Sequence, residues 1–313
     1  MTLNEKMLQL ESRLRAADDQ LSLTRDALMA RYTTLHLGGP ADLLASPSTP
    51  EQVQLLLKTA HELDVPVLVI GNGSNLLVKD GGIRGLVIRL CREMQRIEVK
   101  DGCIRAEAGA MMSTLSMAAA EANLAGLTFA SGIPGTVGGG VYMNAGAYGG
   151  EMCQVVTLVE GYDMAGEPFA YTGEEMAFRH RYSRLMDENK IITHVTFRLT
   201  PGKRDELLAE MVDFNTRRAE KQPLTQFSAG STFKRPPNGF ASAMVDQCGL
   251  KGCTIGGAQV SEKHAGFCIN KGGTSADFLA LIAHVQQVVQ EKFDTLLEPE
   301  VRILGEDAPA KEV

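Results

Sequence analysis

The chain has 313 residues, 44% hydrophobic and 22% charged, a balance typical of globular proteins, and its length suits about two domains. A net charge of −7, an aromatic fraction of 5% and the lack of Lys/Arg runs disfavour nucleic-acid binding. The N-terminal segment alternates acidic and basic side chains, unlike a signal peptide, and no stretch reaches the roughly 18 apolar residues of a transmembrane helix. We therefore expect a cytoplasmic protein that binds neither membranes nor nucleic acids.

The first half of the chain alternates helix and strand signals. Apolar residues recur at helical spacing over residues 3–16, and a second helix should begin near Pro50, since proline favours a first helical turn. An apolar strand at 65–70 then ends in a glycine-rich segment. The remaining pattern predicts an α+β region that ends near Pro201, with a helix at 113–126 and strands at 76–78, 85–90, 96–99, 103–108, 154–164 and 190–199.

A second α+β region is expected to follow. It should open with a helix at 203–222 and contain a helix near 239–249 and a strand near 264–270. A long final helix should begin after an N-cap at Thr274 or Ser275. One face of that helix repeats apolar residues at the helical period, namely Phe278, Leu281, Ile282, Val285, Val289 and Phe293.

The cysteines give no sign of a metal site. They form no CxxC pair, and scattered cysteines in a long chain are usually small buried apolar residues. We therefore expect no bound metal and this buried role for Cys91, Cys103, Cys153, Cys248, Cys253 and Cys268.

The first glycine-rich segment, GNGSN at 71–75, directly follows the apolar strand. Glycine permits positive φ and leaves backbone N–H groups uncovered, and successive N–H groups form a concave anion site. Ser74 and Asn75 add side-chain donors, so the segment suits a pyrophosphate. The alternative is a simple turn, because the same residue types are common in turns.

The second glycine-rich segment, a loop that opens with GIPGTVGGG at 132–140, has eight glycines in the 20 residues 132–151. A flexible linker would be rich in serine, whereas this segment is apolar. A backbone laid against a flat apolar ligand explains that mixture, and the alternative is a buried crossing of two backbones. Because no GxGxxG motif follows the first strand, a dinucleotide here would not be held in the Rossmann manner.

Several stretches together resemble the UDP-N-acetylenolpyruvoylglucosamine reductases of bacterial cell-wall synthesis, over about residues 31–306. The resemblance implies an FAD-binding fold of the vanillyl-alcohol-oxidase and p-cresol-methylhydroxylase type, followed by a smaller α+β substrate-binding domain. It also implies a reaction in which NADPH and FAD supply hydride to the enolpyruvyl ether of a UDP-sugar. The stretches are TTLHLGGPADLL, VIGNGSNLLVKDGGIRGLVI, GIPGTVGGGVYMNAGAYGGE, FRHRYSRL, AGSTFKRP, LKGCTIGGAQVSEKHAGFCIN and LEPEVRILGE.

The same resemblance implies a division of the chain and a cofactor site. The parts would be an N-terminal helical extension at 1–30, an FAD-binding region at 31–201 split near 95–105, a substrate-binding domain at 202–306 and a tail at 307–313. FAD would be bound non-covalently, with His36 as the nearest candidate for the covalent link that this family lacks. The implied FAD-binding residues are Gly71, Asn72, Gly73, Ser74, Asn75, Leu76, Gly132, Ile133, Pro134, Gly135, Thr136, Val137, Gly138, Gly139, Asn144, Ala145 and Gly146.

Three positions match the catalytic residues of the resembled family. Ser231 corresponds to the proton donor, Arg181 to the cation beside the substrate carboxylate, and Glu300 to the acid that assists the intermediate. Taken alone, these residues would be read as a turn serine, a surface ion pair and an exposed strand residue. Implied substrate-binding residues are Lys221, Lys234 and Arg235.

The interval from Arg181 to Lys221 is short, which is typical of the subtype without a substrate-capping tyrosine loop. We expect a monomer whose small-molecule partners are NADPH and the UDP-sugar. Two alternatives stay open: another flavin-dependent oxidoreductase of the same fold, and a flavin-binding protein without catalysis.

Overall fold

A computed structural model describes residues 1–308 and forms two compact units. The first unit comprises Met1–Arg25, Leu43–Asn72 and Gly85–Arg217, and the second comprises Asp26–Asp42, Gly73–Arg84 and the chain from Arg218 onward. Both units are therefore discontinuous in sequence. The linear division at 30, 201 and 306 remains a prediction, and residues 309–313 of the expected tail lie outside the described residues.

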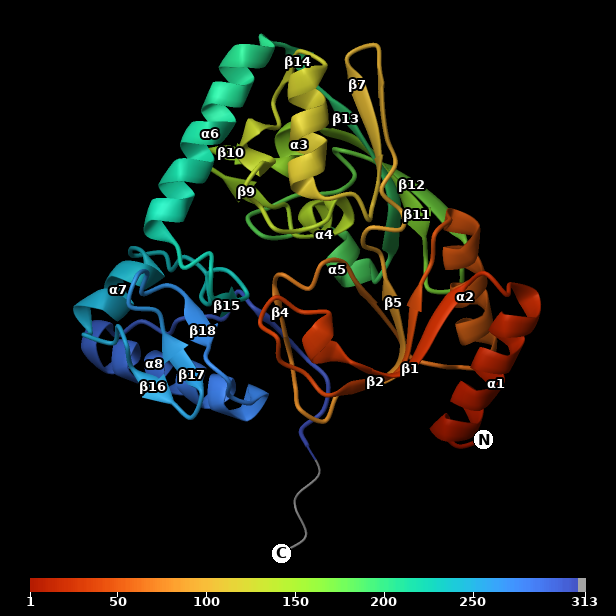
Figure 1. Cartoon of the computed structure of the whole chain (residues 1–313), viewed down its shortest axis with the longest axis horizontal. Helices are drawn as coiled ribbons and strands as arrows, with labels where there is room; N and C mark the ends of the chain where they lie inside the picture. Colours follow the sequence, from red (N-terminus) through yellow and green to blue (C-terminus); the bar gives the residue numbers. More distant parts are fainter. Residues whose placement is uncertain (309–313) are drawn as a thin grey trace, which may run out of the picture. The chain divides into compact units, whose positions relative to one another are not determined.

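The first unit begins with α1 (Leu3–Ala17), which confirms the predicted N-terminal helix. Its start is fixed by a capping box, in which Thr2 Oγ1 accepts from the Glu5 N–H and Glu5 Oε2 accepts from the Thr2 N–H. Helix α1 packs beside α2 (Pro50–Glu62), whose cap is Thr49 and whose first residue is the expected proline (Figure 1).

A four-stranded sheet of order β1-β2-β5-β3 leads to the first glycine-rich segment. The carboxyl end of β3 lies directly before Gly71, and β3 runs parallel to β5. The strands are β1 (Ser22–Leu28), β2 (Pro40–Ser46), β3 (Val67–Ile70) and β5 (Ile83–Arg89).

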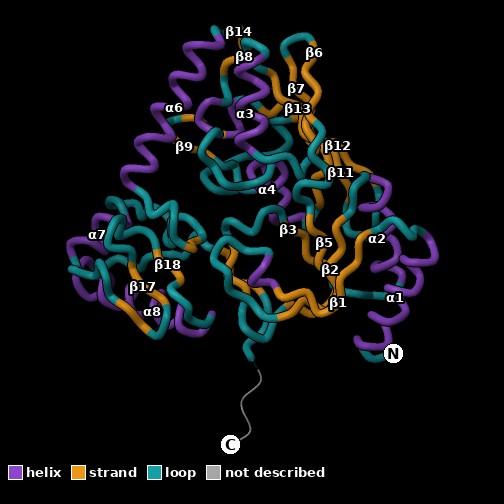
Figure 2. Tube along the Cα trace, viewed as in Figure 1, coloured by secondary structure: helices purple, strands orange, loops and turns teal. Residues whose placement is uncertain are grey.

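A second sheet of the first unit has five antiparallel strands in the order β12-β11-β13-β7-β6 (Figure 2). The strands are β6 (Ile97–Lys100), β7 (Cys103–Glu107), β11 (Val156–Tyr162), β12 (Pro168–Thr172) and β13 (Ile191–Arg198). The helices are α3 (Met112–Glu121), α4 (Val137–Tyr142), α5 (Leu185–Glu188) and α6 (Arg204–Lys221), the last of which continues past Arg217. Two short pairs complete it, β8 (Leu124–Ala125) with β14 (Thr200–Pro201) and β9 (Gly146–Ala147) with β10 (Gly150–Glu151).

The second unit is built on an antiparallel sheet of order β15-β18-β17-β16, against which α8 (Ser275–Phe293) packs. The cap of α8 is Thr274, as predicted, and the expected apolar face is buried except for the half-buried Phe293. The other elements are β4 (Leu76–Val78), β15 (Phe227–Ser228), α7 (Ala241–Gln247), β16 (Thr254–Ile255), β17 (Ala258–Val260), β18 (Cys268–Asn270) and β19 (Arg302–Leu304).

Residues 1–308 were predicted to contain neither a membrane-spanning helix nor a metal site. None of the helices there combines the length and the apolar character that crossing a bilayer requires. The same residues contain no group of three or more His, Cys, Asp or Glu side chains arranged to hold a metal ion.

Candidate active site

The first glycine-rich segment presents unpaired backbone donors at the end of β3. Among the described residues, the N–H groups of residues 72–75 donate to no protein acceptor. Gly73 adopts φ +67°, and a Cβ there would lie 2.1 Å from the Tyr32 carbonyl oxygen, so only glycine fits. Consecutive unpaired N–H groups in such a loop bind anions, so the segment fits a pyrophosphate.

The two glycine-rich segments touch each other within the first unit. The side-chain amide of Asn72 donates to the Pro134 carbonyl at 2.7 Å. A Cβ on Gly71 would lie only 2.3 Å from Thr136 Oγ1. The close approach of the Thr136 side chain therefore accounts for Gly71 without any ligand.

The second segment is not a loop throughout, because α4 begins at Val137 inside it. Thr136 caps this helix, with Oγ1 accepting from the Gly139 N–H at 3.4 Å. The prediction of a continuous glycine loop over 132–140 was therefore wrong in its second half, since a threonine cap outweighs the low helix propensity of three consecutive glycines.

The glycines of α4 fall into two kinds. A Cβ on Gly138 would lie 2.9 Å from the Ala108 Cβ, and one on Gly140 would lie 2.8 Å from the Met112 sulfur. At Gly139 the nearest atom would be Thr136 Oγ1, at an ordinary 3.5 Å. Packing within the protein thus explains Gly138 and Gly140 but not Gly139.

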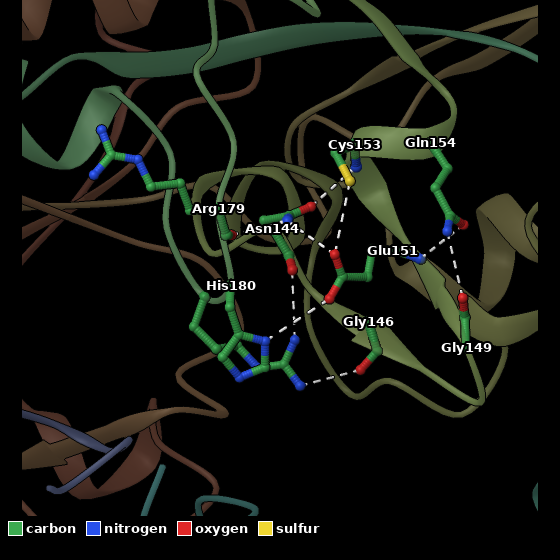
Figure 3. A network of polar contacts seen from close by, with 9 residues as sticks. Asn144, Gly146, Gly149, Glu151, Cys153, Gln154, Arg179 and His180 are labelled. Carbon is green, nitrogen blue, oxygen red and sulfur yellow. Dashed lines mark hydrogen bonds and ion pairs between the residues drawn. The ribbon is translucent and has the colours of Figure 1, made fainter. Parts of the chain in front are cut away.

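Asn144 has a structural role that its residue type did not reveal. Its side chain is 1% exposed and is held on three sides (Figure 3). The amide donates to the Arg179 carbonyl at 3.0 Å and to the Glu151 carboxylate at 3.3 Å, while the amide oxygen accepts from the Cys153 N–H at 2.9 Å. With its side chain occupied in this way, Asn144 can meet a cofactor only through its backbone.

We expect Asn144→Ala to lower the free energy of unfolding by about 2–4 kcal/mol, because it leaves buried polar groups without partners. Chemical unfolding of the FAD-free protein measures this effect. If the FAD-free stability stayed unchanged while FAD affinity fell, Asn144 would be a direct cofactor ligand, as the sequence predicted.

Arg181 lies in the first unit, in a tight turn between two reciprocal backbone hydrogen bonds of Arg179 and Tyr182. Its φ of +54° is unusual for a non-glycine residue, and such conformations are often retained at functional positions. The guanidinium donates to the Gly146 carbonyl at 3.2 Å and to the Asn144 carbonyl at 3.5 Å. The loop after α4 therefore orients Arg181.

The segment after Arg181 is anchored by Glu188. This carboxylate accepts from Lys190 at 2.9 Å, from the Tyr171 hydroxyl at 2.8 Å, and also from Arg184 Nε. The bond from Lys190, followed by those from Arg184 and Tyr171, lowers the pKa of Glu188 to about 2. The cluster ties α5 to the edge strand β12.

The low pKa of Glu188 makes its contribution to stability pH-dependent. Because the folded pKa lies below the ordinary 4.5, the contribution is complete above that value and is lost as the pH falls towards 2. We expect Glu188→Gln to cost about 1–2 kcal/mol at pH 7, after allowance for partial exposure, and less as the pH falls. Urea unfolding between pH 7 and pH 3 measures this. A difference that does not change with pH would contradict it, and the exposed Glu174→Gln is the control.

The second unit brings Ser231 and Glu300 together through the backbone. The Glu300 N–H donates to the carbonyl of Thr232, the residue after Ser231, at 2.8 Å. On its other side, the Glu300 carbonyl accepts from the Asn75 side chain at 3.2 Å. We call residues 228–235, which contain Ser231, the serine segment. The first glycine-rich segment, Glu300 and the serine segment therefore form one hydrogen-bonded series.

The three predicted substrate-binding residues are all exposed in the second unit. Lys221 is the last residue of α6, and Lys234 pairs with Glu298 at 3.1 Å. The Arg235 guanidinium lies 4.1 Å from the centre of the Phe240 ring. Only Lys234 and Arg235 belong to the segment that contains Ser231.

Some features of the site had no sequence signal. Thr232 is 3% exposed, and its Oγ1 accepts from the Cys268 N–H at 2.9 Å, which fixes the backbone next to Ser231. Cys268 is buried, and burial raises the pKa of its thiol to about 11, as expected for an inert cysteine. The expected burial of all six cysteines holds only for Cys91 and Cys268, since Cys153 is exposed and the other three are half-buried, namely Cys103, Cys248 and Cys253.

Comparisons with known proteins match both regions. Residues 41–168 match a family model of an FAD binding domain, and residues 222–304 match the C-terminal domain of UDP-N-acetylenolpyruvoylglucosamine reductase. The reductases of that name from Clostridioides difficile and Lactobacillus helveticus are each 47% identical to this chain, over 90% and 89% of it and 93% and 94% of their own lengths. The crystal structure of the Thermus caldophilus reductase superposes with a TM-score of 0.78 at 35% identity, covering 91% of this chain and 99% of that one.

The fold and these matches together define an FAD-binding oxidoreductase. The chain belongs to the UDP-N-acetylenolpyruvoylglucosamine reductase family. The predicted family, the α+β FAD-binding fold with its smaller second domain, and the FAD cofactor are confirmed.

Proposed function

We propose that this chain reduces the enolpyruvyl ether of UDP-N-acetylglucosamine-enolpyruvate to UDP-N-acetylmuramate, with FAD as cofactor and NADPH as the source of electrons. The observation that carries the proposal is the hydrogen-bonded series from Asn75 through Glu300 to Thr232. It joins the segment suited to a pyrophosphate to the two residues proposed for proton chemistry.

The proposed cradle consists of the N–H groups of residues 72–75, which would bind the pyrophosphate, and the open surface at Gly139. FAD held there and reduced by NADPH would supply the hydride that adds to the distal carbon of the substrate alkene. Gly132, Ile133 and Gly135 would line the same cradle through their backbones, while Asn144 would hold the loop after α4 in place.

The substrate carbon next to the carboxylate becomes an enolate when hydride adds to its neighbour. Arg181 would neutralise the carboxylate and the enolate oxygens, for which a guanidinium fork is suited. Ser231 would then donate its hydroxyl proton to that carbon, and the alkoxide would be reprotonated by water. A serine hydroxyl is a weak acid, but the enolate is strongly basic, so the transfer is favourable. Glu300 would assist as the nearby acid.

The substrate would be held by Lys221, Lys234 and Arg235, whose charges suit its phosphates. We further propose that the enzyme acts as a monomer in the cytoplasm and needs neither a nucleic acid nor a membrane. Incubation with NADPH and the enolpyruvyl substrate, followed by mass spectrometry, tests the proposed function. A product with two more hydrogen atoms than the substrate is expected, and unchanged substrate in the presence of bound FAD would refute it.

A further inference from the structure

His264 is connected to the serine segment through Gly266 but is not one of the residues proposed to be catalytic. It is half-buried in the turn between β17 and β18. Its ring packs edge-on against the Phe267 ring, with 5.0 Å between the two ring centres. The His264 Nδ1 atom accepts a hydrogen bond from the Gly266 N–H at 3.1 Å. An acceptor at Nδ1 requires the neutral ring with its proton on Nε2.

Gly266 is also hydrogen-bonded to the serine segment. Its carbonyl accepts from the N–H of Thr232, the residue after Ser231, at 2.8 Å. The Thr232 carbonyl in turn accepts from the Glu300 N–H at 2.8 Å. Three hydrogen bonds thus run from the imidazole through Thr232, the residue next to Ser231, to the backbone of Glu300.

The close packing at Gly266 leaves the chain little freedom to adjust. A Cβ on Gly266 would lie 3.0 Å from the His264 Cε1 atom and 3.1 Å from the Ser242 Cβ of α7, so this side of the glycine lies close against both side chains. Because Gly266 lies against the imidazole and is hydrogen-bonded to it, removal of the imidazole would allow Gly266, and with it the Thr232 backbone, to shift.

We propose that His264 is a positioning residue: its neutral imidazole, acting through Gly266 and Thr232, holds Ser231 and Glu300 in their reactive arrangement. The proposal rests on the proposed function, because it concerns the residues assigned to proton transfer there. If Nδ1 were protonated, its N–H would face the Gly266 N–H, so Gly266 would lose its hydrogen-bond acceptor. The arrangement would therefore be lost as the pH falls.

The surroundings of His264 favour the neutral ring. Burial lowers its pKa below the ordinary 6.5, a hydrogen bond with the backbone of His264 itself raises it, and the charge of Lys251 lowers it again. Asp246, which is paired with Lys251 at 3.0 Å, has the opposite effect. Since the pKa is lowered, the acceptor is present at neutral pH, and its loss falls below about pH 6.5.

Substitution by asparagine and by alanine separates positioning from simple packing. Asparagine places an amide oxygen near the site of Nδ1 but does not titrate, whereas alanine removes the acceptor. The experiment uses the FAD-loaded protein, reduced anaerobically with NADPH and then mixed with the enolpyruvyl UDP-sugar at several pH values. The rates of flavin reduction and of reoxidation are recorded separately.

We expect His264→Ala to slow reoxidation about 10- to 100-fold at neutral pH and to leave flavin reduction by NADPH unchanged. His264→Asn should keep nearly the wild-type rate and lose the acid-side fall that the wild type shows below about pH 6.5. If His264→Ala does not fold, the pH profile of His264→Asn decides alone.

An unchanged wild-type pH profile in His264→Asn would overturn the proposal, as would equal losses of reduction and reoxidation in His264→Ala. Failure of the wild-type protein itself to be reoxidised by the substrate would refute the proposed function instead. The two failures are therefore distinguishable.

Discussion

Ser231→Ala should reduce its flavin with NADPH as fast as the wild type but should be reoxidised by the enolpyruvyl substrate about 10²–10⁴-fold more slowly. That range is the usual contribution of a positioned proton donor. The alanine removes the hydroxyl and leaves the backbone that Thr232 fixes through Cys268, Gly266 and Glu300. Stopped-flow absorbance of the two half-reactions measures the effect.

A serine three residues away provides the matched control. Ser228 lies in the same segment and contributes its carbonyl, which accepts from the Thr34 hydroxyl at 2.7 Å. Ser228→Ala keeps that carbonyl and should leave both half-reactions unchanged. Normal reoxidation in Ser231→Ala, or equal slowing in both variants, would contradict the role of Ser231 as proton donor.

Gly139→Ala should weaken FAD binding roughly 10- to 100-fold without destabilising the FAD-free protein, because the added methyl meets only the bound group. Within the protein its nearest contact would be an ordinary 3.5 Å from Thr136 Oγ1. Since alanine favours helix over glycine by about 0.5–1 kcal/mol, the melting temperature of the FAD-free protein should stay equal or rise. FAD titration and thermal unfolding measure the two quantities.

The neighbouring glycine should behave in the opposite way. Gly138→Ala would place its Cβ 2.9 Å from the Ala108 Cβ, and such overpacking typically costs 1–3 kcal/mol. We therefore expect a lower melting temperature of the FAD-free protein. If Gly139→Ala instead bound FAD normally, the cradle would not include α4.

Local sequence signals predicted most of the elements. The helix at Leu3–Ala17, the helix that begins at Pro50 and the capped helix α8 follow from apolar periodicity together with recognisable caps. The glycine-rich segment at 71–75 was also placed correctly at the end of a strand. These features depend on neighbours in sequence, so the sequence contains the information directly.

Features that depend on distant neighbours could not be predicted in this way. Glycine alone cannot reveal whether the missing side chain makes room for a ligand or for another part of the protein. Gly71 faces the Thr136 side chain and Gly138 faces Ala108, whereas no close atom of the described residues faces Gly139. The hydrogen bond from Asn144 to the Arg179 carbonyl and the backbone series through Thr232 also join residues far apart in the chain. The proposed catalytic residues were assigned from family resemblance rather than from their local chemistry.

The visible spectrum of the purified protein during one catalytic cycle tests the central claim most directly. The protein should take up FAD, lose its flavin absorbance when NADPH is added without oxygen, and regain it when UDP-N-acetylglucosamine-enolpyruvate is added. Recovery with the enolpyruvyl substrate, and not with UDP-N-acetylglucosamine, would separate this reductase from another flavin oxidoreductase of the same fold. A protein that cannot bind FAD, or whose reduced flavin is unaffected by the substrate, would contradict the account.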